Sequence, residues 1–226
     1  MKVIIAGSTG MVGNLILDIC LHSDKIREVV SFVRKPSGKS RNQKLKEVVI
    51  SDFENYSEYT IYFQNVSSAF FCIGVYTGQV PDEQFKKITV NYAVAFASAL
   101  EQNSKNATLC LLSGAGADRT EKSKTAFAKY KGMAENSISE LSINFHSFRP
   151  GYIYPTIARK EPNIMYKIMR LLYPLIRLFG DNSSIKSNEL AQAMFNVALN
   201  GTEKEILENK DIIKQIIPVP NNVYKK

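Results

Sequence analysis

Three glycines follow the first apolar run of the chain in the stretch "VIIAGSTGMVG". The run Val3–Ala6 is short and continuously apolar, which predicts a strand buried on both faces. Residues 11–22 then carry apolar side chains at helical spacing. Gly7, Gly10 and Gly13 thus lie between a strand and a helix, where free N–H groups at the helix start bind phosphate. We expect a nucleotide-binding loop here, with a plain strand-to-helix turn as the alternative.

Strands and helices continue to alternate along the chain. Apolar runs predict strands at 28–33, 47–50, 69–73, 107–112 and 144–149, and helical spacing predicts helices at 82–103, 123–141, 162–179 and 188–199. The pattern of 162–179 is interrupted at Pro174, and 212–217 is expected to form a last strand or a turn. Such alternation predicts an α/β fold: a Rossmann-like, doubly wound, mainly parallel sheet with helices on both faces.

The composition limits the class of protein. Hydrophobic residues make up 45% of the 226 residues, enough for the core of one domain spanning 1–226. The net charge of +8 is spread without a long basic run, so we expect no nucleic-acid partner. Charged residues interrupt the longest apolar stretch, 164–180, so we expect no membrane span. With no leader-like start, the expected location is the cytoplasm.

The cysteines and histidines do not form a reactive pattern. Cys20, Cys72 and Cys110 lie in apolar segments, and their spacing fits neither a metal site nor a disulfide framework. His22 and His146 are far apart in the sequence. We therefore expect buried, reduced cysteines, no metal and no Ser-His-Asp triad.

The end of the second strand bears on which nicotinamide cofactor binds. A carboxylate at this point would bind the ribose hydroxyls of NAD. This chain has "FVRKPSGK" instead, with Arg34, Lys35 and Lys39 and no acid. A guanidinium can hold a 2′-phosphate in a forked, charge-assisted contact. The sequence therefore favours NADP(H), with NAD(H) as the alternative; a role as a surface residue is the competing reading of each of these basic residues.

Two further strand ends carry candidate cofactor contacts. Asp52 follows the third strand, where a short carboxylate can accept a hydrogen bond from the adenine amino group or cap a turn. Gly74 follows the fourth strand and would let the backbone approach the ribose and phosphates.

An ordered set of motifs indicates a family. The chain contains, in this order, "GSTGMVG", "FFCIGVYT", "VNYAVAFASALEQN", "LLSGAGAD", "KYKGMAE" and "RPGYIYP". It resembles the extended and atypical branch of the short-chain dehydrogenase/reductase superfamily. It is most similar there to the small group around the Tat-interacting protein and its bacterial relatives. The resemblance covers residues 1–199 and implies a Rossmann fold that binds NAD(P).

The resemblance also implies roles for particular residues. Arg34, with Lys35 beside it, would meet the adenosine phosphate, Asn91 would be a structural hydrogen bonder, and 151–226 would add a small substrate-facing lobe. The remaining implied cofactor contacts are Gly7, Thr9, Gly10, Met11, Val12 and Gly13 at the pyrophosphate, Asp52 and Phe53 at adenine, Cys72, Ile73 and Gly74 at the ribose, and Pro150, Gly151, Tyr152 and Ile153 at the nicotinamide.

The catalytic part of the pattern is incomplete. The superfamily uses a tyrosine four residues before a lysine, so that both side chains reach one cleft from one helix face. Lys131 matches the lysine, which would also bind the cofactor ribose, but Phe127 stands at the tyrosine position. A phenyl ring cannot transfer a proton. Tyr130 points about 100° away from Lys131 on a helix and could substitute only after a register shift. Tyr76, Tyr152 and Tyr154 are other candidate proton donors.

The serine of the pattern is ambiguous. Ser113 follows the fifth strand directly, which suits either a catalytic and cofactor-contacting hydroxyl or a turn residue. Gly114 occupies the slot where relatives often carry the working hydroxyl.

Two functions remain open from the sequence. The first is an NADP(H)-dependent oxidoreductase, or an epimerase/dehydratase-like enzyme, acting on a small carbonyl or alcohol with Lys131 and Ser113 as candidate catalytic residues. The second is a non-catalytic NADP(H)-binding redox sensor or regulatory protein. The segment 162–179 suits a substrate lid, a helix that binds a second copy in a homodimer or another partner, or a helix on a membrane surface; the competing reading is a helix packed on the protein's own core.

Overall fold

The computed structural model describes residues 1–38, 42–157, 168, 170–173 and 180–216. Within this part of the chain, seven parallel strands form the main sheet: β1 (Lys2–Ala6), β2 (Glu28–Val33), β3 (Leu45–Val49), β4 (Ser68–Phe71), β5 (Thr108–Leu112), β6 (Asn144–Arg149) and β9 (Ile206–Glu208). Their order across the sheet is β3-β2-β1-β4-β5-β6-β9. The order reverses between β1 and β4, and sheets of this kind bind ligands at that point, beyond the carboxyl ends of the strands.

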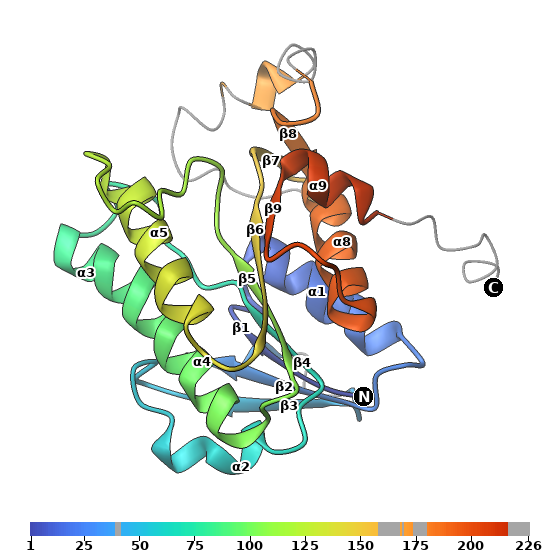
Figure 1. Ribbon diagram of the computed structural model, residues 1–226. Coiled ribbons are helices and arrows are strands. Elements are labelled where there is room, and N and C mark those ends of the chain that lie inside the picture. The colour runs from blue at the N-terminus through green and yellow to red at the C-terminus, as the bar shows by residue number, and fades with distance from the viewer. Residues whose placement is uncertain (39–41, 158–167, 169, 174–179, 217–226) are drawn as a thin grey trace, which may run out of the picture.

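Helices cover both faces of the sheet (Figure 1). On one face lie α1 (Met11–His22), α8 (Ser187–Asn200) and α9 (Asn209–Lys214). On the other lie α2 (Thr60–Phe63), α3 (Asp82–Lys86), α4 (Tyr92–Asn103) and α5 (Ala126–Ser139), with a 3-10 turn at Ser57–Tyr59 and a π-helical turn at Lys87–Asn91 joining α3 to α4. The predicted α/β, doubly wound fold is confirmed.

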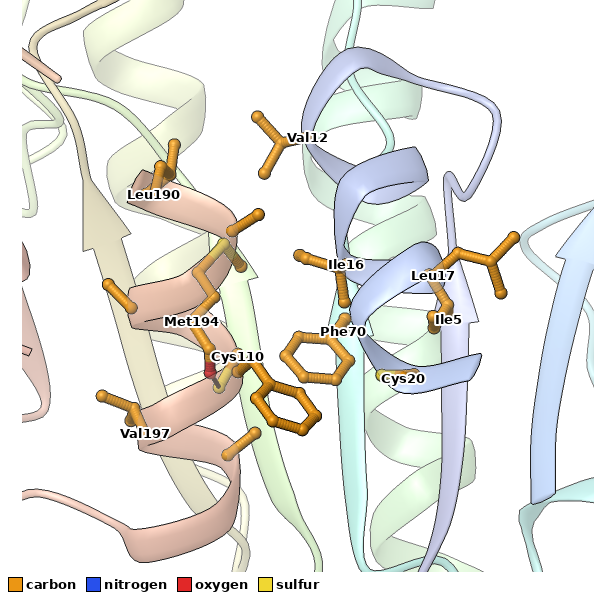
Figure 2. Packing of buried hydrophobic residues seen from close by; sticks show 14 of the residues in the cluster. Ile5, Val12, Ile16, Leu17, Cys20, Phe70, Cys110, Leu190, Met194 and Val197 are labelled. Atoms are coloured by element: carbon orange, nitrogen blue, oxygen red, sulfur yellow. Dashed lines mark hydrogen bonds between the residues drawn. The ribbon is translucent and has the colours of Figure 1, made fainter. Parts of the chain in front are cut away.

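Burial explains why α1 occupies its place. Its buried positions include Val12, Ile16 and Cys20, which lie four residues apart and therefore form one stripe. Figure 2 shows this stripe on the side of α1 toward α8, which carries Met194, with Phe70 of β4 between the two helices. These side chains are almost fully buried, so the first turn of α1 is held rigidly at the carboxyl end of β1.

A second core of aromatic rings lies on the opposite face. Phe32, Phe63 and Phe96 are fully buried and pack against one another, Phe32 and Phe63 stacked at 5.3 Å between ring centroids. Offset and edge-to-face ring pairs add to the free energy of simple burial. This core fixes α4 beside α5, the helix that carries Lys131.

The C-terminal part differs from the sequence prediction. Residues 209–214 form α9, so the predicted last strand or turn at 212–217 is wrong over 212–214, whereas Gln215 does lie in a turn; the last strand, β9, comes earlier at 206–208. A small parallel pair, β7 (Tyr152–Tyr154) and β8 (Ser184–Lys186), was not predicted. Most of the segment 162–179 lies outside the described residues. The division of the chain into one domain with a C-terminal lobe stays a prediction.

The start of α5 also differs from the prediction. The helix begins at Ala126 rather than at residue 123. The N–H of Ser123 donates to the Asp118 carboxylate at 2.8 Å, and the N–H of Thr125 donates to the Ser123 hydroxyl at 3.2 Å. These side-chain hydrogen bonds give the backbone an alternative to the helix.

Candidate functional site

The glycine loop between β1 and α1 packs more tightly than any side chain would allow. A Cβ on Gly13 would lie 2.2 Å from the Gly7 carbonyl oxygen, and one on Gly7 would lie 2.6 Å from the Cys72 carbonyl carbon. Gly7 also has φ of +93°, a left-handed backbone that favours glycine. Gly10 precedes the first turn of α1 and supplies no side-chain cap. The loop therefore leaves first-turn N–H groups without a side-chain partner, as an anion site requires.

A cavity of about 550 Å³ opens at the carboxyl ends of β1, β4, β5 and β6. It is mainly apolar, and it brings together the predicted site residues Gly10, Met11, Val12, Cys72, Ile73, Gly74, Ser113, Lys131, Pro150, Gly151, Tyr152 and Ile153. Sequence reasoning missed Val75, Thr77, Leu112, Ala115 and Pro155, which also line it. These five flank predicted motif residues, so the strand ends themselves were the available signal.

Other predicted contacts lie outside this cavity. Gly7 and Gly13 act through the loop packing just described. Thr9 is exposed in the loop, and Arg34 and Lys35 are exposed just after β2. β2 neighbours β1 in the sheet, so the basic pair follows a strand end beside the glycine loop.

The residues predicted to flank adenine differ from each other in exposure. The Asp52 side chain is exposed, and its carboxylate accepts a hydrogen bond from the Glu54 N–H at 3.0 Å, the geometry of an Asx turn. Phe53 is only 4% exposed and lies 5.6 Å from the ring of Tyr92. Asn91 donates to Glu54 at 2.7 Å and is thus the hydrogen bonder that was predicted.

Lys131 brings a positive charge to the cavity. Its Nζ donates to the Leu112 carbonyl oxygen at 3.0 Å, which fixes the side chain at the end of β5. Burial lowers the pKa of Lys131 to about 8, while the charge of the nearby Glu135 carboxylate acts in the opposite direction. Burial raises the pKa of the Cys72 thiol to about 12, against the effect of Lys131. The lysine therefore titrates near physiological pH, and the thiol stays protonated there.

Phe127 and Gly114 fit each other as a pair. A Cβ on Gly114 would lie 2.5 Å from Cζ of the Phe127 ring and 3.4 and 3.5 Å from its two Cε atoms. Nearly equal distances to the Cε atoms put that Cβ position on the long axis of the ring, beyond its tip. A tyrosine hydroxyl would point into the same place. The tip of the phenyl ring thus excludes a side chain at 114, and both residues line the cavity.

Ser113 lines the cavity, but its hydroxyl is held by a neighbouring side chain. Its hydroxyl donates to the buried Glu135 carboxylate at 2.6 Å, and the Ser147 hydroxyl donates to the same oxygen at 2.7 Å. Arg149 and Arg119 also contact Glu135, at 2.5 and 3.2 Å. Burial acts to raise the pKa of Glu135, but these hydrogen bonds outweigh it and hold the pKa below its usual value. Sequence reasoning missed this network because its members come from the loop after β5, from α5 and from β6, and only their packing unites them.

The tyrosines that could replace the missing phenol lie in different places. The Tyr130 hydroxyl donates to Asp82 of α3 at 2.5 Å on an exposed surface, away from the cavity. Tyr154 stacks on Tyr173 with 4.0 Å between ring centroids. Tyr76 and Tyr152 line the cavity.

No group of three or more His, Cys, Asp or Glu side chains in the described part of the chain could hold a metal ion. None of the helices described is long and apolar enough to cross a membrane.

Comparisons with known proteins agree with the fold. No family model matches the chain. The protein FMP52, mitochondrial, of Coccidioides immitis (strain RS) is 27% identical over 240 residues, which cover 93% of this chain and 94% of that protein. The structure of Gre2 from Candida albicans, a complex with NADPH, has a TM-score of 0.70 at 12% identity and covers 92% of this chain and 78% of that one.

The description of a second similar structure names a family. A short-chain dehydrogenase/reductase from Saccharomyces cerevisiae has a TM-score of 0.65 at 15% identity, covering 93% of this chain and 96% of that chain. The Rossmann fold that the sequence motifs implied is thereby confirmed, because the chain shares it with this structure.

Proposed function

We propose that the protein is an NADP(H)-dependent oxidoreductase. One observation carries the proposal: a single cavity joins the uncapped start of α1 to Lys131, at the point where the strand order reverses. The nicotinamide cofactor would supply a hydride. The residues present fit this cofactor. Close backbone contacts at Gly7 and Gly13 take up the space that a Cβ would fill, and they shape the loop as an anion site.

The chain's own groups would divide the work. First-turn amides of α1 would hold the pyrophosphate, and the backbone at Cys72–Gly74 would pass beside the ribose. Lys131 would hold the nicotinamide ribose with the ammonium that the Leu112 carbonyl positions. Pro150–Ile153 would border the nicotinamide. The location in the cytoplasm stays a prediction, since the Coccidioides relative carries the name of a mitochondrial protein. The homodimer stays a prediction as well.

A second candidate is a non-catalytic NADP(H)-binding sensor or regulator. The observation that favours it is the Phe127–Gly114 pair, which places no hydroxyl beside Lys131. Calorimetric titration with NADPH, followed by NADPH oxidation assays, separates the two. Both candidates require NADPH binding. Turnover of NADPH with any acceptor supports the enzyme, and absence of both NADPH and NADH binding would refute both candidates.

Arg34→Ala is expected to weaken NADPH binding by about 10- to 100-fold, as loss of a charge-assisted contact to the 2′-phosphate requires. NADH binding should stay unchanged. Arg27→Ala is the matched control, because Arg27 is exposed at the opposite end of β2. Calorimetric titration with both coenzymes checks this, and an equal loss for NADPH and NADH would contradict the assignment of Arg34.

The charge of Lys131 should make NADPH affinity depend on pH. Since burial lowers its pKa to about 8, the ammonium is present below that pH and lost as the pH rises through it. Affinity is therefore expected to fall across about pH 7–9. Lys131→Met should bind weakly and lack this step. A natural chain whose affinity is flat between pH 7 and 9 would show that Lys131 does not contact the cofactor.

A further inference from the structure

We propose that the protein reduces quinones in this cavity with NADPH. Quinones are conjugated dicarbonyl acceptors whose reduction needs no proton from the protein. The inference rests on the NADP(H) binding proposed above and names the substrate class of the same site. It follows from what occupies the positions beside Lys131.

Carbon fills both positions from which a proton donor would act. The tip of the Phe127 ring contacts Gly114, and neither residue carries a hydroxyl. The adjacent Ser113 hydroxyl donates to Glu135, and the Tyr130 hydroxyl donates to Asp82 outside the cavity. Relaxation of a single side chain therefore does not restore the missing donor.

The charge that remains is suited to stabilising an anion. Lys131 is the one charged side chain among the described residues that line the cavity. Its Nζ donates to the Leu112 carbonyl oxygen, so its position is fixed before a substrate arrives. A fixed cation in an apolar site lowers the energy of a negative oxygen without giving up its proton.

The chemistry then distinguishes two acceptor classes. In either case the C–H bond of the reduced nicotinamide breaks and its hydride carries both electrons to the acceptor. The new bond is a C–H bond at the carbonyl carbon of a ketone, or an O–H bond at one carbonyl oxygen of a quinone, whose other oxygen then carries the negative charge. A simple ketone becomes an alkoxide. An alkoxide is about as basic as hydroxide, and the conjugate acid of hydroxide, water, has a pKa of about 15.7. A quinone becomes a hydroquinone monoanion, a phenolate-type oxygen with a conjugate acid of pKa about 10, as in tyrosine. This anion survives beside Lys131 and takes its proton from water.

The lining of the cavity suits a flat apolar acceptor. Phe127, Val75 and Ile153 contribute apolar surface from α5, the segment after β4, and β7. Aromatic rings pair favourably with other flat π-systems. A naphthoquinone presents such a surface together with two carbonyl oxygens.

The test compares acceptors that share a carbon skeleton. NADPH oxidation is followed with 1,4-naphthoquinone and with 1-tetralone, after subtraction of the reaction without protein. A general acid contributes about 10²- to 10⁴-fold, so we expect kcat/KM to favour the quinone by at least this factor. Equal or better reduction of 1-tetralone would overturn the proposal. Tetralone reduction that disappears in Tyr76→Phe or Tyr152→Phe would overturn it as well, because a phenol would then supply the proton.

Binding gives a second readout that does not depend on turnover. Calorimetry should show 1,4-naphthoquinone binding to the NADP⁺ complex, and Phe127→Leu should weaken this binding by up to about tenfold through loss of the ring contact. Circular dichroism checks that the variant folds. NADPH binding without quinone binding or turnover overturns this inference and leaves the cofactor assignment standing. Absence of NADPH binding overturns the proposed function and this inference with it.

Discussion

Glu135→Ala is expected to lower the free energy of unfolding by about 3–5 kcal/mol, the loss typical when one partner of a buried ion pair is removed. Glu135 is fully buried and accepts hydrogen bonds from Ser113, Ser147, Arg119 and Arg149. Its removal leaves the half-buried Arg149 guanidinium and two buried hydroxyls without that acceptor. Chemical denaturation monitored by circular dichroism measures the change.

Glu140→Ala is the matched control for this prediction. Glu140 is exposed at the C-terminal end of the same helix, and substitutions at such sites change stability by about 0.5 kcal/mol or less. The pH dependence gives a further check. The pKa of Glu135 is lowered in the fold, so its stabilisation is present above the unfolded pKa of about 4.3 and is lost as the pH falls through the folded value. A Glu135→Ala protein as stable as the natural chain would show that the network does not hold the fold.

The network matters for the site because of what it connects. Glu135 lies one helical turn beyond Lys131 on α5, and its partners lie on β6 and in the loop directly after β5. These are the elements whose carboxyl ends line the cavity. The carboxylate thus fixes the position of the Lys131 helix against the sheet.

Most of the sheet could be predicted from the sequence because its strands are short apolar runs buried on both faces. Runs such as 28–33 and 144–149 agree with β2 and β6 to the residue. β9 escaped prediction because it is three residues long, Ile206–Glu208, and pairs with the edge of the sheet. α9 escaped because six residues are too few for a clear helical period.

The site was predictable where backbone geometry decides it and unpredictable where side-chain direction does. The glycine loop and the strand-end residues needed only the order of strand, turn and helix. Ser113 shows the limit, because sequence position puts it at the cavity while its hydroxyl turns to Glu135. The match between Phe127 and Gly114 was equally hidden, since thirteen residues separate them and only packing shows their contact.

Gly13→Ala is expected to weaken NADPH binding by about 100-fold or more, the loss that a misplacement of about 1 Å causes in a positioned site. An added Cβ would lie 2.2 Å from the Gly7 carbonyl oxygen, and neither atom belongs to a flexible side chain that could move away. The first turn of α1 and the loop must therefore separate, which redirects the amides that would hold the pyrophosphate. We also expect about 1–3 kcal/mol of lost stability, the usual result of overpacking.

Gly10→Ala provides the graded comparison within the same loop. Its Cβ would lie 3.2 Å from the same Gly7 oxygen, a contact that a shift of a few tenths of an ångström relieves. NADPH affinity should therefore fall less than in Gly13→Ala, and calorimetric titration of the natural chain and both variants measures the order. If Gly13→Ala binds NADPH as tightly as the natural chain, the glycine loop does not hold the dinucleotide. Close packing between Gly7 and Gly13 would then serve only to seat α1 on the sheet.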